Sequence, residues 1–131
     1  MPTDRLTNRD YQHLLEFRTE LRRFLAWSEE QAKTLGLTAP QHQLLLAVRG
    51  HLDPQGPTVG DVADLLLLRH HSVVGLVDRA VDAGLVRRKA DAVDHRVVRL
   101  TLTPLGTRKL AALSRRHLEE LARLKTGVLS S

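Results

Sequence analysis

The sequence predicts a mainly helical α+β fold in which a small β-hairpin follows a pair of short helices. Two short amphipathic patterns lie between residues 58 and 84, with only the polar break Arg69-His70-His71 between them. Two β-type runs joined by a charged connection follow, and long apolar stripes at helical spacing occupy both ends of the chain. We therefore expect one domain over residues 1–131, with a central lobe at 37–103 and long helices at 7–36 and 104–131.

The first long helix is expected over residues 7–36. Thr7 and Asp10 have the spacing of a capping box, and Gly36 favours a helix end. The apolar residues of this segment recur at helical steps: Tyr11, Leu14, Leu15, Phe17, Leu21, Phe24 and Leu25. Because so broad an apolar face must be covered, we expect the C-terminal helix and the same helices of a second copy to pack on it.

Two shorter helices are predicted next. Thr38 with Gln41, and Thr58 with Asp61, repeat the capping-box spacing, and HLDPQGP between these helices has the composition of a loop. A further helix then places Val73, Leu76, Val77, Ala80 and Val81 on one apolar face. Its opposite face carries short or hydrogen-bonding residues, which are His70, His71, Ser72, Gly75 and Arg79.

This pair of helices has the pattern of a helix-turn-helix that binds DNA. In such proteins the second helix enters the major groove and reads base edges from its N-terminal half, which would place the polar face against DNA. Arg79 could donate two hydrogen bonds to a phosphate or to a guanine edge. The alternative interpretation is an ordinary solvated helix face, which any small protein can have.

The hairpin is expected to have strands at Leu85–Lys89 and around Val98–Leu102, with a tip from Asp91 to Arg96. Its basic residues would concentrate positive charge beside the second helix: Arg87, Arg88, Lys89, Arg96 and Arg99. The formal charge of +5 and the pI near 10.4 also favour a polyanionic partner. We predict that Arg87 and Arg88 contribute to DNA binding. The last helix should start at Thr103-Pro104 and carry Leu110, Leu113, Leu121, Leu124 and Val128 as its apolar stripe.

Four blocks of this sequence resemble the winged-helix regulators of the MarR (multiple antibiotic resistance regulator) family. They are LTAPQHQLLLAV, TVGDVADLL, HHSVVGLVDRAVDAGLVRR and DHRVVRLTLTPLG. The resemblance spans Leu37 to Gly106. It implies a homodimeric transcription regulator that binds double-stranded DNA at a pseudo-palindromic operator and is often released by a small ligand or an oxidant. It also implies dimerisation through the long helices and a short third strand near Pro57-Thr58.

The tip of the hairpin matches the family pattern in part. The pattern reads roughly Asp-x-Arg-Asp-x-Arg, and this chain has Asp91, Val93, Asp94 and Arg96, so a valine replaces the first arginine. The resemblance implies that Arg96 reaches the minor groove with Asp94 orienting it, because narrow grooves attract arginine. The alternative is a simple ion pair that stabilises the turn.

Other kinds of chemistry find little support in the sequence. The absence of cysteine excludes disulfides and thiol-based sensing, and the seven histidines, at 13, 42, 51, 70, 71, 95 and 117, show no HxxxH spacing, so we predict no metal site. There is no GxSxG, HExxH or glycine-rich phosphate loop, so we predict neither an enzyme nor a cofactor. We expect a cytoplasmic protein without a membrane partner, because no apolar stretch approaches the length of a membrane span and the N-terminus is charged.

The function predicted from the sequence is a sequence-specific transcription regulator, a repressor released by a small-molecule inducer. The inducer pocket is expected between the long helices and the lobe, with Trp27, Leu45 and Leu66 in its lining. Two alternatives use the same fold differently. One is an architectural DNA binder that tolerates any sequence, and the other is a winged helix that contacts proteins.

Overall fold

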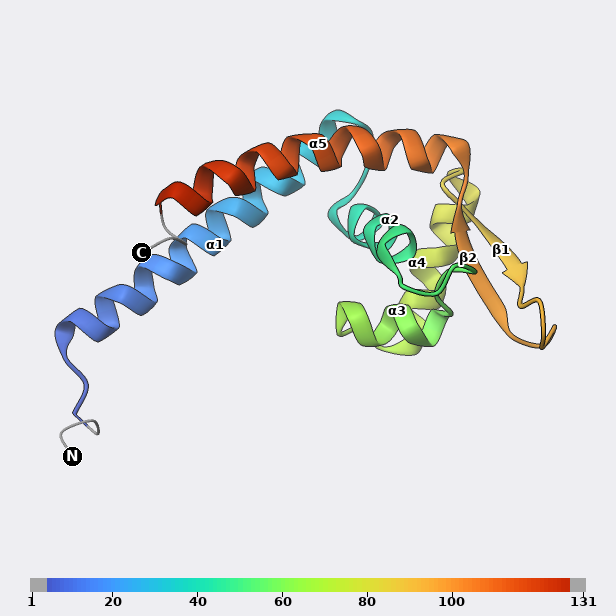
Figure 1. Cartoon of the computed structure of the whole chain (residues 1–131), viewed down its shortest axis with the longest axis horizontal. Helices are drawn as coiled ribbons and strands as arrows, with labels where there is room; N and C mark the ends of the chain where they lie inside the picture. The colour runs from blue at the N-terminus through green and yellow to red at the C-terminus, as the bar shows by residue number, and fades with distance from the viewer. Residues whose placement is uncertain (1–4, 128–131) are drawn as a thin grey trace.

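A hairpin-bearing lobe attached to two long helices makes up the computed structural model (Figure 1), which describes residues 5–127 and the side chains up to Leu124. Val128, the last member of the predicted C-terminal stripe, and the rest of 128–131 lie outside the described residues, as do residues 1–4. The elements in chain order are α1 (Asn8–Thr34), α2 (Ala39–Gly50), α3 (Val59–Leu66), α4 (His70–Asp82), β1 (Val86–Ala90), β2 (Val98–Leu102) and α5 (Pro104–Gly127).

The first three helices begin at the predicted capping boxes. In each of them a threonine hydroxyl accepts from the backbone N–H three residues later, and the side chain of that residue accepts from the threonine N–H. The helix α1 ends at Thr34, two residues before Gly36, whose φ of 75° is accessible to glycine at little cost. The N–H of Leu37 then donates to the carbonyl of Ala32 at 3.0 Å, which closes the last turn.

The core of the protein lies in the lobe, around α2. Leu44 and Leu45 of α2, Val73 and Val77 of α4, and Leu100 of β2 are fully buried. Leu113 brings the first half of α5 into the same core. The many elements that contact α2 explain why it is more apolar than a surface helix, since α1, α3, α4, α5 and β2 all pack against it.

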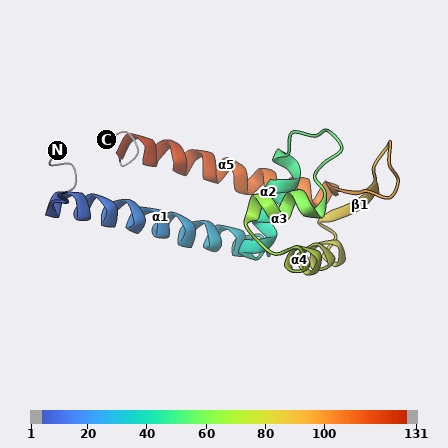
Figure 2. The same cartoon turned by 90° about the horizontal axis from the view of Figure 1, so that it is seen from below.

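The long helices extend away from this core. Both views show the N-terminal part of α1 and the C-terminal part of α5 projecting in the same direction beyond the lobe (Figures 1 and 2). Ala32 is the only buried residue of α1, and most of the predicted apolar stripe exposes 44–64% of its surface: Tyr11, Leu14, Leu15, Phe17, Leu21 and Leu25. Within one chain, α5 therefore leaves the apolar face of α1 largely uncovered. None of the described helices combines the length and the apolar character that a membrane span requires.

The hairpin pairs β1 with β2 in antiparallel register, from Val86 opposite Leu102 to Ala90 opposite Val98. The third strand that was expected near Pro57-Thr58 is not formed in the described part of the chain. The carbonyl of Pro57 instead accepts one hydrogen bond from the N–H of Leu100, at 2.8 Å. Proline has no N–H to continue a ladder, and Thr58 is already the N-cap of α3, so the pairing ends after one bond.

Candidate nucleic-acid interface

The helix α4 buries one face and presents the other to solvent, as its sequence predicts. Val73, Leu76, Val77 and Ala80 are buried in the lobe. On the opposite side His70, His71, Ser72 and Arg79 are exposed and Gly75 is half-buried, so the structure brings the predicted residues together on one surface. The turn before α4 contains Leu67 in the left-handed conformation, with φ of 56°, which closes α3 and redirects the chain.

The N-terminus of α4 differs from those of the preceding helices. Its N-cap is Arg69, which makes no side-chain hydrogen bond to the first turn, whereas α1, α2 and α3 all begin with capping boxes. The N–H of Ser72 donates to the carbonyl of Arg69 at 3.0 Å, which leaves the amides of His70 and His71 for an external acceptor. Together with the helix dipole, these amides favour an anion such as a backbone phosphate at this end.

Arg79 and Gly75 are coupled within α4. A Cβ added at Gly75 would lie 3.3 Å from Nη1 of Arg79, so the guanidinium folds back over the position where Gly75 has no side chain. The small residue thus leaves space for the long one at a spacing of four residues, where helix side chains meet. Arg79 can extend from this position toward a partner in front of α4.

The basic residues of β1 differ in their availability. Arg87 is exposed, while the guanidinium of Arg88 forms an ion pair with Asp78 on α4. This pair joins the hairpin to α4 across their shared surface. Arg88 would have to exchange Asp78 for a phosphate before it could bind DNA, so Arg87 is the more accessible of the two.

Arg96 projects from the tip of the hairpin. Its side chain is 92% exposed, and Asp94 holds it through both carboxylate oxygens, with Nε–Oδ1 at 3.0 Å and Nη2–Oδ2 at 3.2 Å. This hydrogen bonding lowers the pKa of Asp94 below its usual value and raises that of Arg96, so both are charged at neutral pH. Asp94 therefore orients Arg96, and Val93, which stands where the family pattern has an arginine, is 91% exposed.

Arg99 does not add to the positive surface, and that prediction was wrong. Its side chain is only 18% exposed and lies between the start of the tip and the α2–α3 loop. There its Nε donates to Oδ2 of Asp91 at 2.9 Å. Alternation along β2 predicted which face Arg99 would occupy, but not that carboxylates from the hairpin itself, the α2–α3 loop and the start of α3 would surround it.

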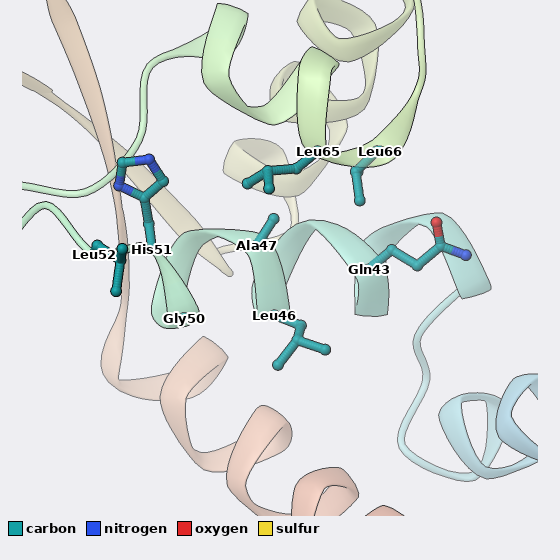
Figure 3. Close-up of a pocket in the computed structure, with 8 residues that line it drawn as sticks. All are labelled: Gln43, Leu46, Ala47, Gly50, His51, Leu52, Leu65 and Leu66. Atoms are coloured by element: carbon teal, nitrogen blue, oxygen red, sulfur yellow. The ribbon is translucent and has the colours of Figure 1, made fainter.

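A cavity of about 540 Å³ opens between α2 and α3 (Figure 3). Its lining is mainly apolar and consists of Gln43, Leu46, Ala47, Gly50, His51, Leu52, Leu65 and Leu66. Of the three residues expected to line an inducer pocket, only Leu66 does so. Leu45 is fully buried in the core, and Trp27 lies elsewhere, at the junction of α1 with α5.

That junction contains a histidine pair that the sequence analysis did not single out. The rings of His42 on α2 and His117 on α5 lie 4.8 Å apart, with Trp27 4.9 Å from His117. Nδ1 of His117 lies 2.7 Å from the carbonyl of Leu113, and Nε2 lies 2.6 Å from Oγ of Ser28. Because a carbonyl only accepts, Nδ1 donates to Leu113, and Nε2 lies within hydrogen-bond distance of the serine hydroxyl.

Burial, and then the neighbouring charge of His117, lower the pKa of His42. His42 lies three residues before Leu45 and so shares the apolar face of α2, and this spacing is the feature of the sequence that indicates its burial. Over the part of the chain that the structure describes, no three or more histidine, cysteine or acidic side chains gather as metal ligands would.

Comparisons with known proteins agree on one family. The family model described as "MarR family" matches residues 35–97, and no curated protein matches the chain. The MarR family transcription regulator SP03579 is 26% identical, with a TM-score of 0.76 over 89% of this chain and 76% of its own. The complex of MepR from S. aureus with DNA is 22% identical, with a TM-score of 0.72 over 86% of this chain and 81% of its own. CouR from Rhodococcus jostii RHA1 bound to p-coumaroyl-CoA is 24% identical, with a TM-score of 0.73 over 87% of this chain and 77% of its own.

Proposed function

Because the chain belongs to the MarR family of winged-helix transcription regulators, which bind DNA and are not enzymes, we propose that it is a homodimeric repressor of a specific operator. In this proposal residues 37–103 form the DNA-binding lobe of a single domain, and residues 7–36 and 104–131 form the dimerisation helices. The observation that carries it is the exposed polar face of α4, with its uncapped N-terminus, beside a hairpin whose tip projects an oriented arginine.

These two features fit two grooves of one duplex. The face of α4 would enter the major groove, with His70, His71 and Ser72 at its N-terminal end, where recognition helices read base edges. Gly75 allows close approach, and Arg79 donates to a phosphate or a guanine. Arg87 and Arg88 would contact the backbone beside the groove. Arg96, held by Asp94, would enter the adjacent minor groove, where negative potential is strongest in A·T-rich sequence.

The exposed stripe of α1 supports the homodimer. Six large apolar side chains on one helix form a larger uncovered surface than a monomeric protein usually keeps in water. A second copy would cover that stripe with its own α1 and α5, since the same surface then serves both partners about a two-fold axis. The two α4 helices would reach half-sites about 10 base pairs apart, which makes the operator pseudo-palindromic.

The cavity between α2 and α3 supports release by a small ligand. Its volume lies within the range of small-molecule sites, and its apolar lining with Gln43 and His51 as polar groups suits an apolar molecule with one or two hydrogen-bonding groups. Nε2 of His51 also lies 3.7 Å from Oδ2 of Asp61, which caps α3. An occupant that binds better to the free form than to the DNA-bound form would lower operator affinity by that difference. CouR, which was solved with p-coumaroyl-CoA, is a structural neighbour that binds a ligand.

Selection of bound fragments from the source genome, at a low and a raised salt concentration, tests the proposed function. A repressor keeps its preference for a pseudo-palindromic site as salt rises, because base contacts survive when counterion release weakens. An architectural DNA binder would lose affinity for all fragments together. A winged helix that contacts proteins would retain no fragment at either salt concentration, and each of these two results would contradict the proposal.

A further inference from the structure

Next to its tip, the hairpin holds a cluster of charged side chains that the proposed DNA contacts do not use. Arg99 lies at its centre and faces carboxylates from three segments. Its Nε is 2.9 Å from Oδ2 of Asp91, while its Nη1 is 3.4 Å from Oδ2 of Asp53 and 3.9 Å from Oδ2 of Asp61. Nη1 also donates to the carbonyl of Gly56 at 3.3 Å. One guanidinium thus joins β2 to the α2–α3 loop and to the start of α3.

Asp91 carries this connection into the tip of the hairpin. Its side chain is only 8% exposed, and Oδ1 accepts from the backbone N–H groups of Val93 at 2.8 Å and Asp94 at 2.9 Å. These bonds, followed by the one from Arg99, lower the pKa of Asp91 to about 2. The carboxylate is therefore charged throughout the neutral range, and it fixes the backbone of the residue that orients Arg96.

Gln55 connects the loop to the tip a second time. Its amide nitrogen lies 3.3 Å from Oδ2 of Asp91, and its amide oxygen accepts from the N–H of Ala92 at 2.8 Å. The neighbouring Gly56 lies so close to β2 that an added Cβ would be 2.0 Å from the carbonyl oxygen of Leu100. Loop and hairpin are thus packed backbone to backbone, with Arg99 bridging the polar edge of that contact.

We propose that Arg99 is a positioning residue, which holds the hairpin tip against the α2–α3 loop so that Arg96 is presented at a fixed distance from α4 before DNA binds. The proposal rests on the proposed function and adds to it a residue that does not touch DNA. A tip that is already ordered loses less conformational freedom on binding, so affinity rises without a further contact.

The geometry requires an arginine at this position. The guanidinium donates in several directions at once, from Nε to Asp91 and from Nη1 to Gly56, with Asp53 and Asp61 beside it. A lysine carries one compact ammonium group and cannot span the same set of acceptors from one position. Arg99→Lys therefore keeps the charge but loses part of the connection.

The test compares Arg99→Ala, Arg99→Lys and Arg96→Ala on the selected operator duplex, with affinity measured over a series of salt concentrations. Arg96→Ala removes a DNA contact, so it should lower affinity and reduce the slope of log K against log salt by about 1. Arg99→Ala should lower affinity by about five- to tenfold with an unchanged slope, because only pre-organisation is lost. Arg99→Lys should fall between Arg99→Ala and the wild type, also with an unchanged slope.

Two controls isolate the effect. Arg49→Ala removes one exposed charge from α2, outside the cluster, and reports the effect of net charge alone. Amide exchange at Val93 and Asp94 should be faster in Arg99→Ala, while exchange at the buried Leu100 stays slow. Arg99→Lys keeps the proposal testable if the alanine variant does not fold.

Wild-type affinity in Arg99→Ala would overturn the proposal, and Arg99→Lys replaces this variant if the alanine variant does not fold. A decrease of the salt slope equal to that of Arg96→Ala would also overturn it, because Arg99 would then contact DNA directly. Neither result would contradict the proposed function as a repressor that binds an operator. Failure of the wild-type chain to bind any duplex would instead contradict the proposed function.

Discussion

The central lobe and the long helices differ in how much of their apolar surface one chain can cover. In the lobe, Leu45 and Val77 are fully buried, and the hairpin is joined to the loop by a continuous set of hydrogen bonds. Along α1, by contrast, Leu15 is 64% exposed and Leu14 is 57% exposed. The lobe therefore carries its own stabilising contacts, whereas the apolar face of the long helices is left for the proposed second copy to cover.

The largest expected effect comes from removing core volume in the lobe. Leu45→Ala should lower the free energy of unfolding by about 2–5 kcal/mol, because the surrounding helices cannot close the space. The loss, measured by urea unfolding, should be the same at low and high protein concentration. Leu15→Ala is the matched control on α1. Its loss of unfolding free energy should differ between low and high protein concentration. Equal behaviour of the two variants would remove the distinction between the regions.

The next effect tests the α1 face directly. Leu14→Glu combined with Leu21→Glu places charges on the exposed stripe and should separate the two copies. Operator affinity should then fall by on the order of 100-fold, because each lobe binds its half-site without the help of the other. Sedimentation velocity and far-UV circular dichroism would show a smaller particle with an intact fold. Gln12→Glu, off the stripe on the same helix, should change neither the mass nor the affinity.

Helix caps give a smaller contrast between the same two regions. Thr58→Ala removes the hydroxyl that accepts from Asp61 N–H at the start of α3, and it should cost about 1 kcal/mol of stability. Thr7→Ala removes the equivalent bond at the projecting end of α1, where the helix can fray without exposing any core. Its cost in urea unfolding should be clearly lower than that of Thr58→Ala, and an equal cost would indicate that the end of α1 is packed.

The smallest effect concerns pH at the junction of the two regions. The pKa of His42 is lowered from its ordinary value of 6.5 by burial and by His117, so the unfolded chain binds this proton more readily than the folded chain. Stability from this source is fully present above pH 6.5 and decreases as the pH falls below it. The thermal midpoint should therefore be lower at pH 5.5 than at pH 7.5, and His42→Gln should reduce the difference. Emission from Trp27, the only tryptophan, gives a local readout of the same junction.

Local sequence patterns predicted most of the fold but only part of the candidate site. Thr7, Thr38 and Thr58 located helix starts because capping depends on residues three positions apart. The exposed face of α4 followed in the same way from helical spacing. The exposure of these residues and their binding to DNA are separate predictions, and helical spacing gives only the first.

Contacts between distant segments could not be predicted in this way. Alternation along the strand places Arg99 on the face opposite Leu100. It does not indicate that Asp53 in the α2–α3 loop and Asp61 at the start of α3 lie against that face. The pairing of His42 with His117 likewise depends on how α5 crosses α2. Such contacts depend on tertiary packing, which periodicity and composition do not encode directly.

In the proposed complex, two copies of the chain present two α4 helices to one duplex. Sedimentation equilibrium of the protein with the selected operator, at several protein concentrations, measures this most directly. We expect a complex of two chains per duplex, in which each half-site of the pseudo-palindrome is protected from cleavage. A complex of one chain per duplex, or binding that protects no defined half-sites, would contradict it.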